Sequence, residues 1–293
     1  MSLTEKTVLA FGAGAIAKGF VPEGATEFSR GYVPAFLEAG ARVVVVSRGR
    51  SADDAVELFQ DLGNIVAVHC DATDRIGVES VFYAAVERYG GVDVIINGSG
   101  GVQPATVVAA NKETGQTASE KFRDITVDDI HKVFDANYTS KVIAAQVFSD
   151  YLLNSSRTGS VVNITSMSGL RPLSKVMFYS DAFASVESFT HNAASFFGQN
   201  GIGRVNNVAV GFMLGEQNRK LLVDENTGLP TPRGSEILSN IALGRHVTPK
   251  EIASMVLYLA DDDVSSGITG ATYRVDAGFG LIDLALTAAY RPT

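Results

Sequence analysis

The sequence predicts an α/β fold, in which one doubly wound parallel sheet of about seven strands is flanked by helices. Short runs rich in valine and isoleucine recur at nearly even intervals, and most are continuous, as in strands buried on both faces. Stretches with helical spacing lie between them, so strand and helix alternate throughout. No linker-like run and no internal repeat divides the 293 residues, and we therefore predict a single domain over residues 1–293.

Each predicted element follows from a local pattern. The strands are predicted, in chain order, at Val8–Phe11, Val43–Val46, Ile65–Val68, Val92–Ile96, Val161–Ile164, Val205–Val210 and Ala271–Val275. The helices are predicted at Gly31–Ala39, Ser51–Leu62, Val78–Tyr89, Val127–Leu153, Phe178–Phe197 and Pro249–Leu259. Ser51 and Thr126 offer N-cap oxygens before acidic residues, and Thr248 precedes a proline at the first helical position. Right-handed crossovers between parallel strands then place all the strands in one sheet.

Two long connections interrupt this alternation, at Ser99–Ile125 and Gly211–Val247. Connections of this length in a compact domain are usually lids or binding loops, although surface elaboration is the alternative. Both leave the carboxyl end of a predicted strand, which is where ligands bind in open α/β sheets. We therefore predict that residues 99–125 and 211–247 are the substrate loops.

The charge balance and the cysteine content exclude several classes of protein. Lys and Arg total 24 against 32 Asp and Glu, a net charge of −8, which argues against a nucleic-acid partner and an anionic membrane surface. The lone thiol of Cys70 cannot form an internal disulfide, which is typical of a reducing compartment. No secretory leader pattern opens the chain, and no apolar run approaches the ~18–20 residues of a membrane span. These observations predict a cytoplasmic protein.

A glycine pattern after the first predicted strand indicates a dinucleotide site of the Rossmann type. Residues 12–17, Gly-Ala-Gly-Ala-Ile-Ala, fit G-x-G-x-x-G/A, in which glycines let the backbone approach a pyrophosphate near a helix N-terminus. Pro22 and Gly24 would break a helix here, so residues 16–30 are predicted to form an enlarged phosphate loop. A Gly/Ala-rich turn without a ligand is the alternative. The expected cofactor contacts in this turn are Gly12, Gly14, Ala15 and Ile16.

The ends of the next strands extend the predicted cofactor site. Ser47 and Arg48 follow the second strand, where an acidic residue would bind the adenosine ribose and repel a 2′-phosphate, so they favour NADP(H) over NAD(H). Surface residues without a ligand are the alternative. Further contacts are expected at the strand ends, where turn chemistry is the other explanation, from Asp71, Ala72, Asn97, Gly98 and Gly211.

Four motifs in order resemble the short-chain dehydrogenase/reductase family over almost the whole chain. The family's N-N-A-G is present as Asn97-Gly98-Ser99-Gly100, and its helix asparagine matches Asn137. Its strand motif G-x-h-h-N-h-S-S is present as Gly159–Ser166, and Tyr179 begins the Y-x-x-x-K helix thirteen residues later. The resemblance implies that Ser166 polarises a carbonyl group, that Tyr179 is the acid or base, and that Asn137 holds a water. It also implies a small-molecule substrate and a homodimer or homotetramer.

A narrower likeness is to the family's sugar-acid branch, typified by D-mannonate (fructuronate) oxidoreductases. It rests on Pro172–Val176, Gly211-Phe212 and Glu216–Arg219. The branch implies a sugar acid, a polyol or another polar carbonyl compound as substrate, with Lys175 and Arg219 as candidate carboxylate contacts. Surface charge on a lid is the alternative for these two side chains.

The chain departs from the family pattern at the catalytic lysine, which in the family holds the nicotinamide ribose and lowers the pKa of the tyrosine. Phe183 stands at that position, and no lysine or arginine lies between Lys175 and Arg204. Phe11 replaces the threonine that precedes the family's glycine loop. A free tyrosine titrates near pH ~10, so Tyr179 is a neutral acid at neutral pH, suited to reduction, while the phenolate needed for oxidation is scarce. We therefore predict slow or redirected chemistry that favours reduction.

These motifs leave two classes of function open. The first is an NADP(H)-dependent oxidoreductase that transfers hydride to or from a polar carbonyl or hydroxyl group. The alternative is a cofactor-independent lyase, isomerase or dehalogenase, with Phe11, Phe20 and Phe183 filling a vacated nicotinamide pocket, or a catalytically impaired nucleotide-binding protein. The four histidines have no metal-ligand spacing, so no metal site is predicted.

Overall fold

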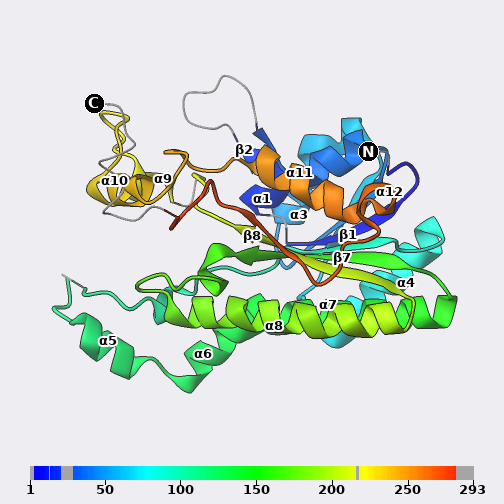
Figure 1. Cartoon of the computed structure of the whole chain (residues 1–293), viewed down its shortest axis with the longest axis horizontal. Coiled ribbons are helices and arrows are strands. Elements are labelled where there is room, and N and C mark those ends of the chain that lie inside the picture. Colours follow the sequence, from blue (N-terminus) through cyan, green and yellow to red (C-terminus); the bar gives the residue numbers. More distant parts are fainter. Residues whose placement is uncertain (1–2, 13, 21–28, 112, 216–217, 282–293) are drawn as a thin grey trace.

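A computed structural model describes residues 3–12, 14–20, 29–111, 113–215 and 218–281. Its central strands are β1 (Thr7–Phe11), β4 (Arg42–Ser47), β5 (Ile65–His69), β6 (Val94–Asn97), β7 (Gly159–Ser166), β8 (Gly203–Val210) and β9 (Thr272–Val275). They form one seven-stranded sheet in the order β5-β4-β1-β6-β7-β8-β9, with every neighbouring pair parallel (Figure 1). The predicted single α/β sheet of the Rossmann type, with about seven parallel strands flanked by helices, is confirmed.

Helices cover both faces of this sheet (Figure 1). One face carries α2 (Tyr32–Glu38), α3 (Ser51–Phe59) and α11 (Pro249–Ala260), and the other carries α4 (Arg75–Tyr89), α7 (Ser140–Ser155) and α8 (Met177–Gln199). Alternate residues of β1 face the two cores, with Val8 and Ala10 in the first and Leu9 and Phe11 in the second. Strands buried on both faces therefore form continuous apolar runs in the sequence. Shorter helical turns are η1 (Gln60–Leu62), η4 (Met167–Gly169) and α12 (Asp262–Ser265).

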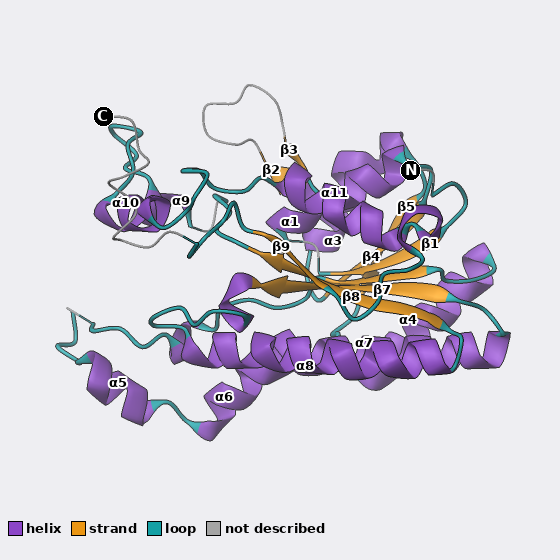
Figure 2. Cartoon of the chain, viewed as in Figure 1, coloured by secondary structure: helices purple, strands orange, loops and turns teal. Residues whose placement is uncertain are grey.

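The strand order reverses at β1, which lies between β4 and β6. The carboxyl ends of β1 and β6 therefore form a topological switch point, where open α/β sheets bind ligands. The two long connections contain η2 (Pro104–Thr106) and α5 (Ala118–Asp124) in one, and α9 (Arg219–Leu222) and α10 (Pro232–Ser239) in the other. Figure 2 shows α5, α9 and α10 at the end of the molecule toward which the arrows of β8 and β9 point.

The segment after β1 differs from a plain loop. Its described part contains α1 (Ala15–Lys18) and a short antiparallel pair of β2 (Gly19–Phe20) with β3 (Ser29–Arg30). Residues 21–28 of the predicted enlarged phosphate loop lie outside the described residues. The first long helix is α2, as predicted at Gly31–Ala39, and it ends before Gly40, whose φ of +85° suits a glycine after a helix.

The predicted helical stretch Val127–Leu153 is confirmed as continuously helical, but it is not α-helical throughout. It is divided into α6 (Val127–Phe134), a π-helical segment η3 (Asp135–Thr139) and α7. A π-turn inserts one extra residue into the helical hydrogen-bond ladder. The apolar periodicity does not reveal this segment, which contains Asn137.

Candidate active site

The two predicted catalytic hydroxyl groups lie together. Ser166 is the last residue of β7, and its side chain is 8% exposed. Tyr179 lies in the first turn of α8, and the Ser166 hydroxyl is near enough to its phenol to lower the pKa of that group. The Ser166 Oγ also accepts a hydrogen bond of 3.2 Å from the backbone N–H of Ser168, which fixes its direction. The structure therefore brings Ser166 and Tyr179 together, and their catalytic roles stay predictions.

Burial sets the protonation state of Tyr179. Loss of solvation raises the pKa of the phenol above its ordinary value of 10.0, and the hydrogen bond with Ser166 offsets only part of that rise. At neutral pH the side chain is therefore a neutral phenol with a proton to donate. A phenolate base would form only in strongly alkaline solution.

Phe183 stands one turn beyond Tyr179 and packs directly against it. The two ring centroids are 4.7 Å apart, with an interplanar angle of 78°, an edge-to-face contact. Phe183 is buried and faces no solvent. α8 thus carries an apolar ring at the position where the family has a cation.

A cation reaches Phe183 from a different helix. Lys141 of α7 is 1% exposed, and its ammonium lies 5.7 Å from the centroid of the Phe183 ring. The same ammonium donates a hydrogen bond of 2.6 Å to the backbone carbonyl of Ser99. Burial lowers the pKa of Lys141 to about 7. Lys141 was not among the predicted site residues, although its position four residues after Asn137, in the same continuous helical stretch, was the available signal.

Asn137 anchors the loop that follows β6. Its side chain accepts a hydrogen bond of 2.8 Å from the N–H of Gly101 and donates one of 3.1 Å to the Gly101 carbonyl. It also donates one of 2.8 Å to the carbonyl of Val133. A Cβ on Gly100 would lie 2.4 Å from Asn137 Oδ1, so glycine is required there. The side chain is therefore engaged with the protein, and its expected role of holding a water stays a prediction.

The backbone at the switch point forms a cradle that fits a dinucleotide. A Cβ on Gly12 would lie 2.6 Å from the carbonyl carbon of Gly98, and the φ of Gly12 is +88°, so two loops meet there without side chains. Gly14, by contrast, has open space where a Cβ would be. Close backbone approach with space above the second glycine is what a pyrophosphate requires. The backbones of Ala15 and Ile16 begin α1, and their side chains lie outside the described part.

The polar residues expected around the adenosine are arranged in two groups. Ser47 Oγ accepts a hydrogen bond of 3.1 Å from the N–H of Ala52, so it caps the start of α3. Arg48 is largely exposed and lies 3.6 Å from the carboxylate of Asp71. Hydrogen bonds from Thr73 and the charge of Arg48 lower the pKa of Asp71 against the opposing effect of burial. Ala72 is partly buried beside them.

Two of the predicted cofactor contacts have buried structural partners. Asn97 is 1% exposed and donates a hydrogen bond of 2.9 Å to Asn163 on β7, so its side chain lies inside the sheet rather than in the crevice. A Cβ on Gly211 would lie 2.5 Å from the Cα of Asp276, because the chain after β9 passes close to it. Their expected contacts with the cofactor stay predictions.

The candidate substrate residues come from the loops around Tyr179. Lys175 is exposed and has a φ of +74°, a strained conformation for a non-glycine residue, and its carbonyl accepts a hydrogen bond of 2.8 Å from Val108. The 99–125 loop is thereby joined to the segment before Tyr179. Arg219 begins α9 in the 211–247 loop and is exposed, while Glu216 and Gln217 lie outside the described residues.

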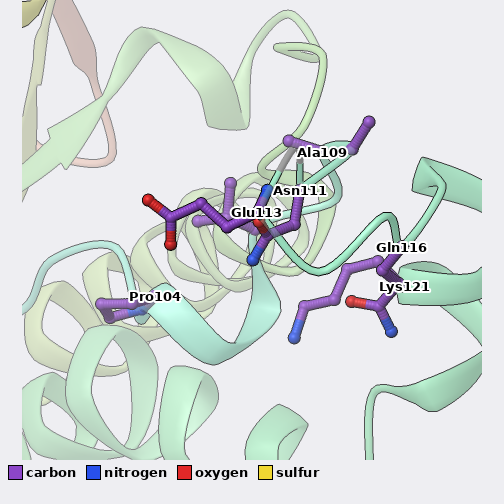
Figure 3. Close-up of a pocket in the computed structure, with 8 residues that line it drawn as sticks. Pro104, Ala109, Asn111, Glu113, Gln116 and Lys121 are labelled. Carbon is purple, nitrogen blue, oxygen red and sulfur yellow. The ribbon is translucent and has the colours of Figure 1, made fainter.

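A cavity of about 460 Å³ lies within the 99–125 loop (Figure 3). It is lined by Pro104, Val107, Ala109, Ala110, Asn111, Glu113, Gln116 and Lys121. None of the predicted catalytic or cofactor residues lines it. The cavity therefore belongs to the 99–125 loop and is separate from Ser166 and Tyr179.

Of the three aromatic residues proposed to fill a vacated pocket, Phe11 is packed into the core instead. Phe11 faces the core beneath α4, with its ring centroid 6.5 Å from that of Phe82. The side chain of Phe20 lies outside the described part, and Phe183 packs beside Tyr179. In the described ranges, no group of three His, Cys, Asp or Glu side chains is placed to hold a metal ion. None of the helices described there is long and apolar enough to cross a membrane.

The known proteins to which this chain is similar are oxidoreductases. A family model described as Enoyl-(Acyl carrier protein) reductase matches residues 25–280. An uncharacterized oxidoreductase, UxuB, of Bacillus subtilis is 34% identical over 244 residues, covering 82% of this chain and 86% of the relative. The galactitol 2-dehydrogenase of Agrobacterium fabrum is 27% identical, covering 85% and 91%.

Solved structures are similar over nearly the whole length. A protein from Haemophilus influenza assigned as a D-mannonate oxidoreductase, with NAD bound, superimposes with a TM-score of 0.80 at 26% identity, covering 96% of this chain and 97% of the other. A Burkholderia xenovorans protein assigned as a short-chain dehydrogenase/reductase, at 23% identity and a TM-score of 0.75, shares the fold. With the family match over residues 25–280, the seven-stranded sheet and the Ser166–Tyr179 pair, the chain belongs to the short-chain dehydrogenase/reductase family of nicotinamide-dependent oxidoreductases.

Proposed function

We propose that this chain is an NADP(H)-dependent oxidoreductase that transfers hydride to or from a polar carbonyl or hydroxyl group of a sugar acid, polyol or similar compound, and that it favours reduction. The observation that carries the proposal is the proximity of the buried Ser166 hydroxyl to the Tyr179 phenol, whose pKa it lowers. The pair follows β7, and the glycine cradle follows β1 and β6, so both lie at the carboxyl edge of one parallel sheet.

In the reduction, Ser166 orients and polarises the carbonyl oxygen, and Tyr179 donates its phenolic proton to that oxygen. A bound reduced nicotinamide supplies the hydride that forms the new C–H bond. The phenolate left on Tyr179 then takes a proton from solvent. The raised pKa of Tyr179 keeps the acid protonated at neutral pH, which supports reduction and disfavours oxidation.

The preference for NADP(H) is supported by the residues after β4. No carboxylate stands at Ser47, and the exposed guanidinium of Arg48 is available at the strand end for a 2′-phosphate. The ion pair of Arg48 with Asp71 is solvent-exposed, so it costs little to exchange for a phosphate. The structurally similar Haemophilus protein carries NAD, so the preference is tested directly below.

The substrate class is supported by the relatives and by the loops. The names of similar proteins include a galactitol 2-dehydrogenase and a D-mannonate oxidoreductase, which act on a polyol and a sugar acid. Lys175 and Arg219 are exposed cations on the loops that border the site. Each could bind a substrate carboxylate. The homo-oligomeric assembly and the cytoplasmic location stay predictions.

Calorimetric titration with NADPH and with NADH tests the proposal, followed by turnover assays with galactitol and D-mannonate. We expect NADPH to bind at least tenfold more tightly than NADH, and Arg48→Ala to remove most of that difference. The matched control is Arg50→Ala, because Arg50 pairs with Asp54 and Glu57 and should leave NADPH affinity unchanged. Absence of binding by both nucleotides at millimolar concentration would refute the function.

A further inference from the structure

We propose that Lys141 is the positioning cation of this active site, supplying from α7 the positive charge that α8 lacks at Phe183. The inference rests on the proposed function, because it assigns Lys141 a role toward the nicotinamide end of the cofactor. It concerns a residue that neither the family motifs nor the sequence pattern singles out. Three structural observations support it.

The first observation is the position of the ammonium. It is bound to the Ser99 carbonyl, and Ser99 belongs to the loop that leaves β6 at the switch point. Asn137, one turn earlier, holds Gly101 of the same loop through two hydrogen bonds. Lys141 and Asn137 therefore fasten the cofactor-side loop to the α6–α7 helical segment at two points.

The second observation is the contact of the Lys141 ammonium with Phe183, the residue that stands where the family has its lysine. The Phe183 ring lies 5.7 Å from the Lys141 ammonium and 4.7 Å from the Tyr179 ring, so it touches both the cation and the acid. The negative face of an aromatic ring stabilises a nearby ammonium, more strongly in a desolvated place. The phenylalanine thus provides a favourable environment for a charge that comes from the neighbouring helix.

The third observation is that the charge of Lys141 has no counter-ion among the described residues. Lys141 is 1% exposed, and within that part of the chain it forms no ion pair and hydrogen-bonds only to Ser99. Burying an unpaired lysine is costly, and such groups are concentrated at functional sites. An anionic cofactor above the Ser99 loop, and the phenolate that develops on Tyr179 during reduction, are the charges this ammonium would stabilise.

The protonation states of Lys141 and its neighbour Tyr179 determine which measurement can detect the charge of Lys141. Tyr179 on α8 stays neutral because burial raises its pKa, and burial lowers the pKa of Lys141 to about 7. Lys141 is therefore only partly protonated in neutral solution. Binding of an anionic dinucleotide close to it should raise its pKa and draw a proton from the buffer.

The test measures proton uptake by titrating NADH calorimetrically in buffers of different ionisation enthalpy at about pH 7.5. NADH avoids the titrating 2′-phosphate of NADPH. The wild-type chain should take up a measurable fraction of a proton, and Lys141→Met should take up none and bind about tenfold more weakly. Lys141→Arg should keep the affinity without proton uptake, because a guanidinium stays charged at this pH. Lys132→Met, an exposed lysine of α6, is the control and should behave as wild type.

Rescue separates a charge effect from a packing effect. At an effective dielectric constant of about 20, a unit charge about 10 Å from the phenolate that develops on Tyr179 changes the rate of reduction by roughly tenfold. Lys141→Met should therefore lower kcat for reduction about tenfold, with a smaller change in substrate KM. Adding Phe183→Lys to Lys141→Met should recover most of that loss, because the cation returns to α8.

The outcomes separate this inference from the proposed function. If the wild-type chain binds neither NADH nor NADPH, the proposed function fails and the inference with it. If it binds NADH without proton uptake, or if folded Lys141→Met binds and turns over like wild type, the inference alone is overturned. If Lys141→Met fails to fold, the inference is still tested by proton uptake in the wild-type chain and by its loss in Lys141→Arg.

Discussion

Gly169 lies directly against the backbone of α8 at Phe183, so close that a Cβ on Gly169 would stand 2.8 Å from the Phe183 carbonyl carbon. Gly169 ends the η4 turn that follows Ser166, and Phe183 is one turn beyond Tyr179. This backbone contact therefore sets how closely the end of β7 approaches α8. The same contact holds Ser166, three residues before Gly169, near the first turn of α8 that carries Tyr179.

Gly169→Ala should push η4 away from α8 and weaken the Ser166–Tyr179 pair. We expect a loss of about 1–3 kcal/mol in the free energy of unfolding from overpacking, and at least a tenfold fall in kcat. Denaturant unfolding and turnover assays measure the two effects. Gly198→Ala in α8 is the control, because a Cβ on Gly198 would meet nothing within 4 Å. That variant should gain about 0.5–1 kcal/mol. Full activity in folded Gly169→Ala would disprove the packing argument.

The oxidation rate should rise with pH until beyond pH 10. Oxidation needs the Tyr179 phenolate, and burial raises the pKa of this phenol above 10.0, so the fraction of base increases tenfold per pH unit below that pKa. The pH profile of kcat/KM for a polyol substrate measures this. Tyr179→Phe should abolish both directions. A plateau reached below about pH 9 would show that Tyr179 is not the titrating base.

Folding stability should increase with pH just above neutrality because of Lys141. Its folded-state pKa, about 7, is below that of an unfolded lysine, so above pH ~7 the unfolded chain holds a proton that the folded chain has lost. The free energy of unfolding then gains about 1.4 kcal/mol per pH unit. The raised pKa values of Cys70 and Tyr179 act in the opposite direction at higher pH, so the window is about pH 7–8.5. The slope should be absent from Lys141→Met; an equal slope in both proteins would contradict the assignment.

Asn137→Leu should loosen the loop after β6. The substitution keeps the volume but leaves the partly buried N–H and carbonyl of Gly101 without their partner, at a cost of about 1–2 kcal/mol in the free energy of unfolding. We expect nucleotide affinity to fall more than stability alone explains, measured by calorimetry on the folded fraction. Asn154→Leu, at an exposed position of α7, should change stability by about 0.5 kcal/mol or less. Unchanged affinity in Asn137→Leu would exclude the anchoring role.

Several features could be read from local patterns. The valine-rich runs place the strands because a doubly covered parallel strand has no polar face to interrupt its sequence. The order of short motifs identifies Ser166 and Tyr179, and the glycines after β1 and β6 mark the crevice because only they permit the backbones to meet. The π-helical segment Asp135–Thr139 was not predicted, because one extra residue in a helical turn hardly changes the apolar spacing; its Asn137 contacts a loop more than thirty residues earlier in the chain.

The amino-acid order alone thus defined the strand sequence, the family and the acid–base pair, because these depend on periodicity and on motifs that are local along the chain. It also revealed that position 183 carries no charge. Folding decided where a replacement charge comes from: Lys141 is 42 residues away from Phe183 in the chain, yet its ammonium lies 5.7 Å from that ring. Contacts between helices cannot be inferred from the spacing within either one, because they depend on how both helices pack on the sheet. Whether this oxidoreductase has a cation beside its tyrosine is therefore a property of the packed molecule.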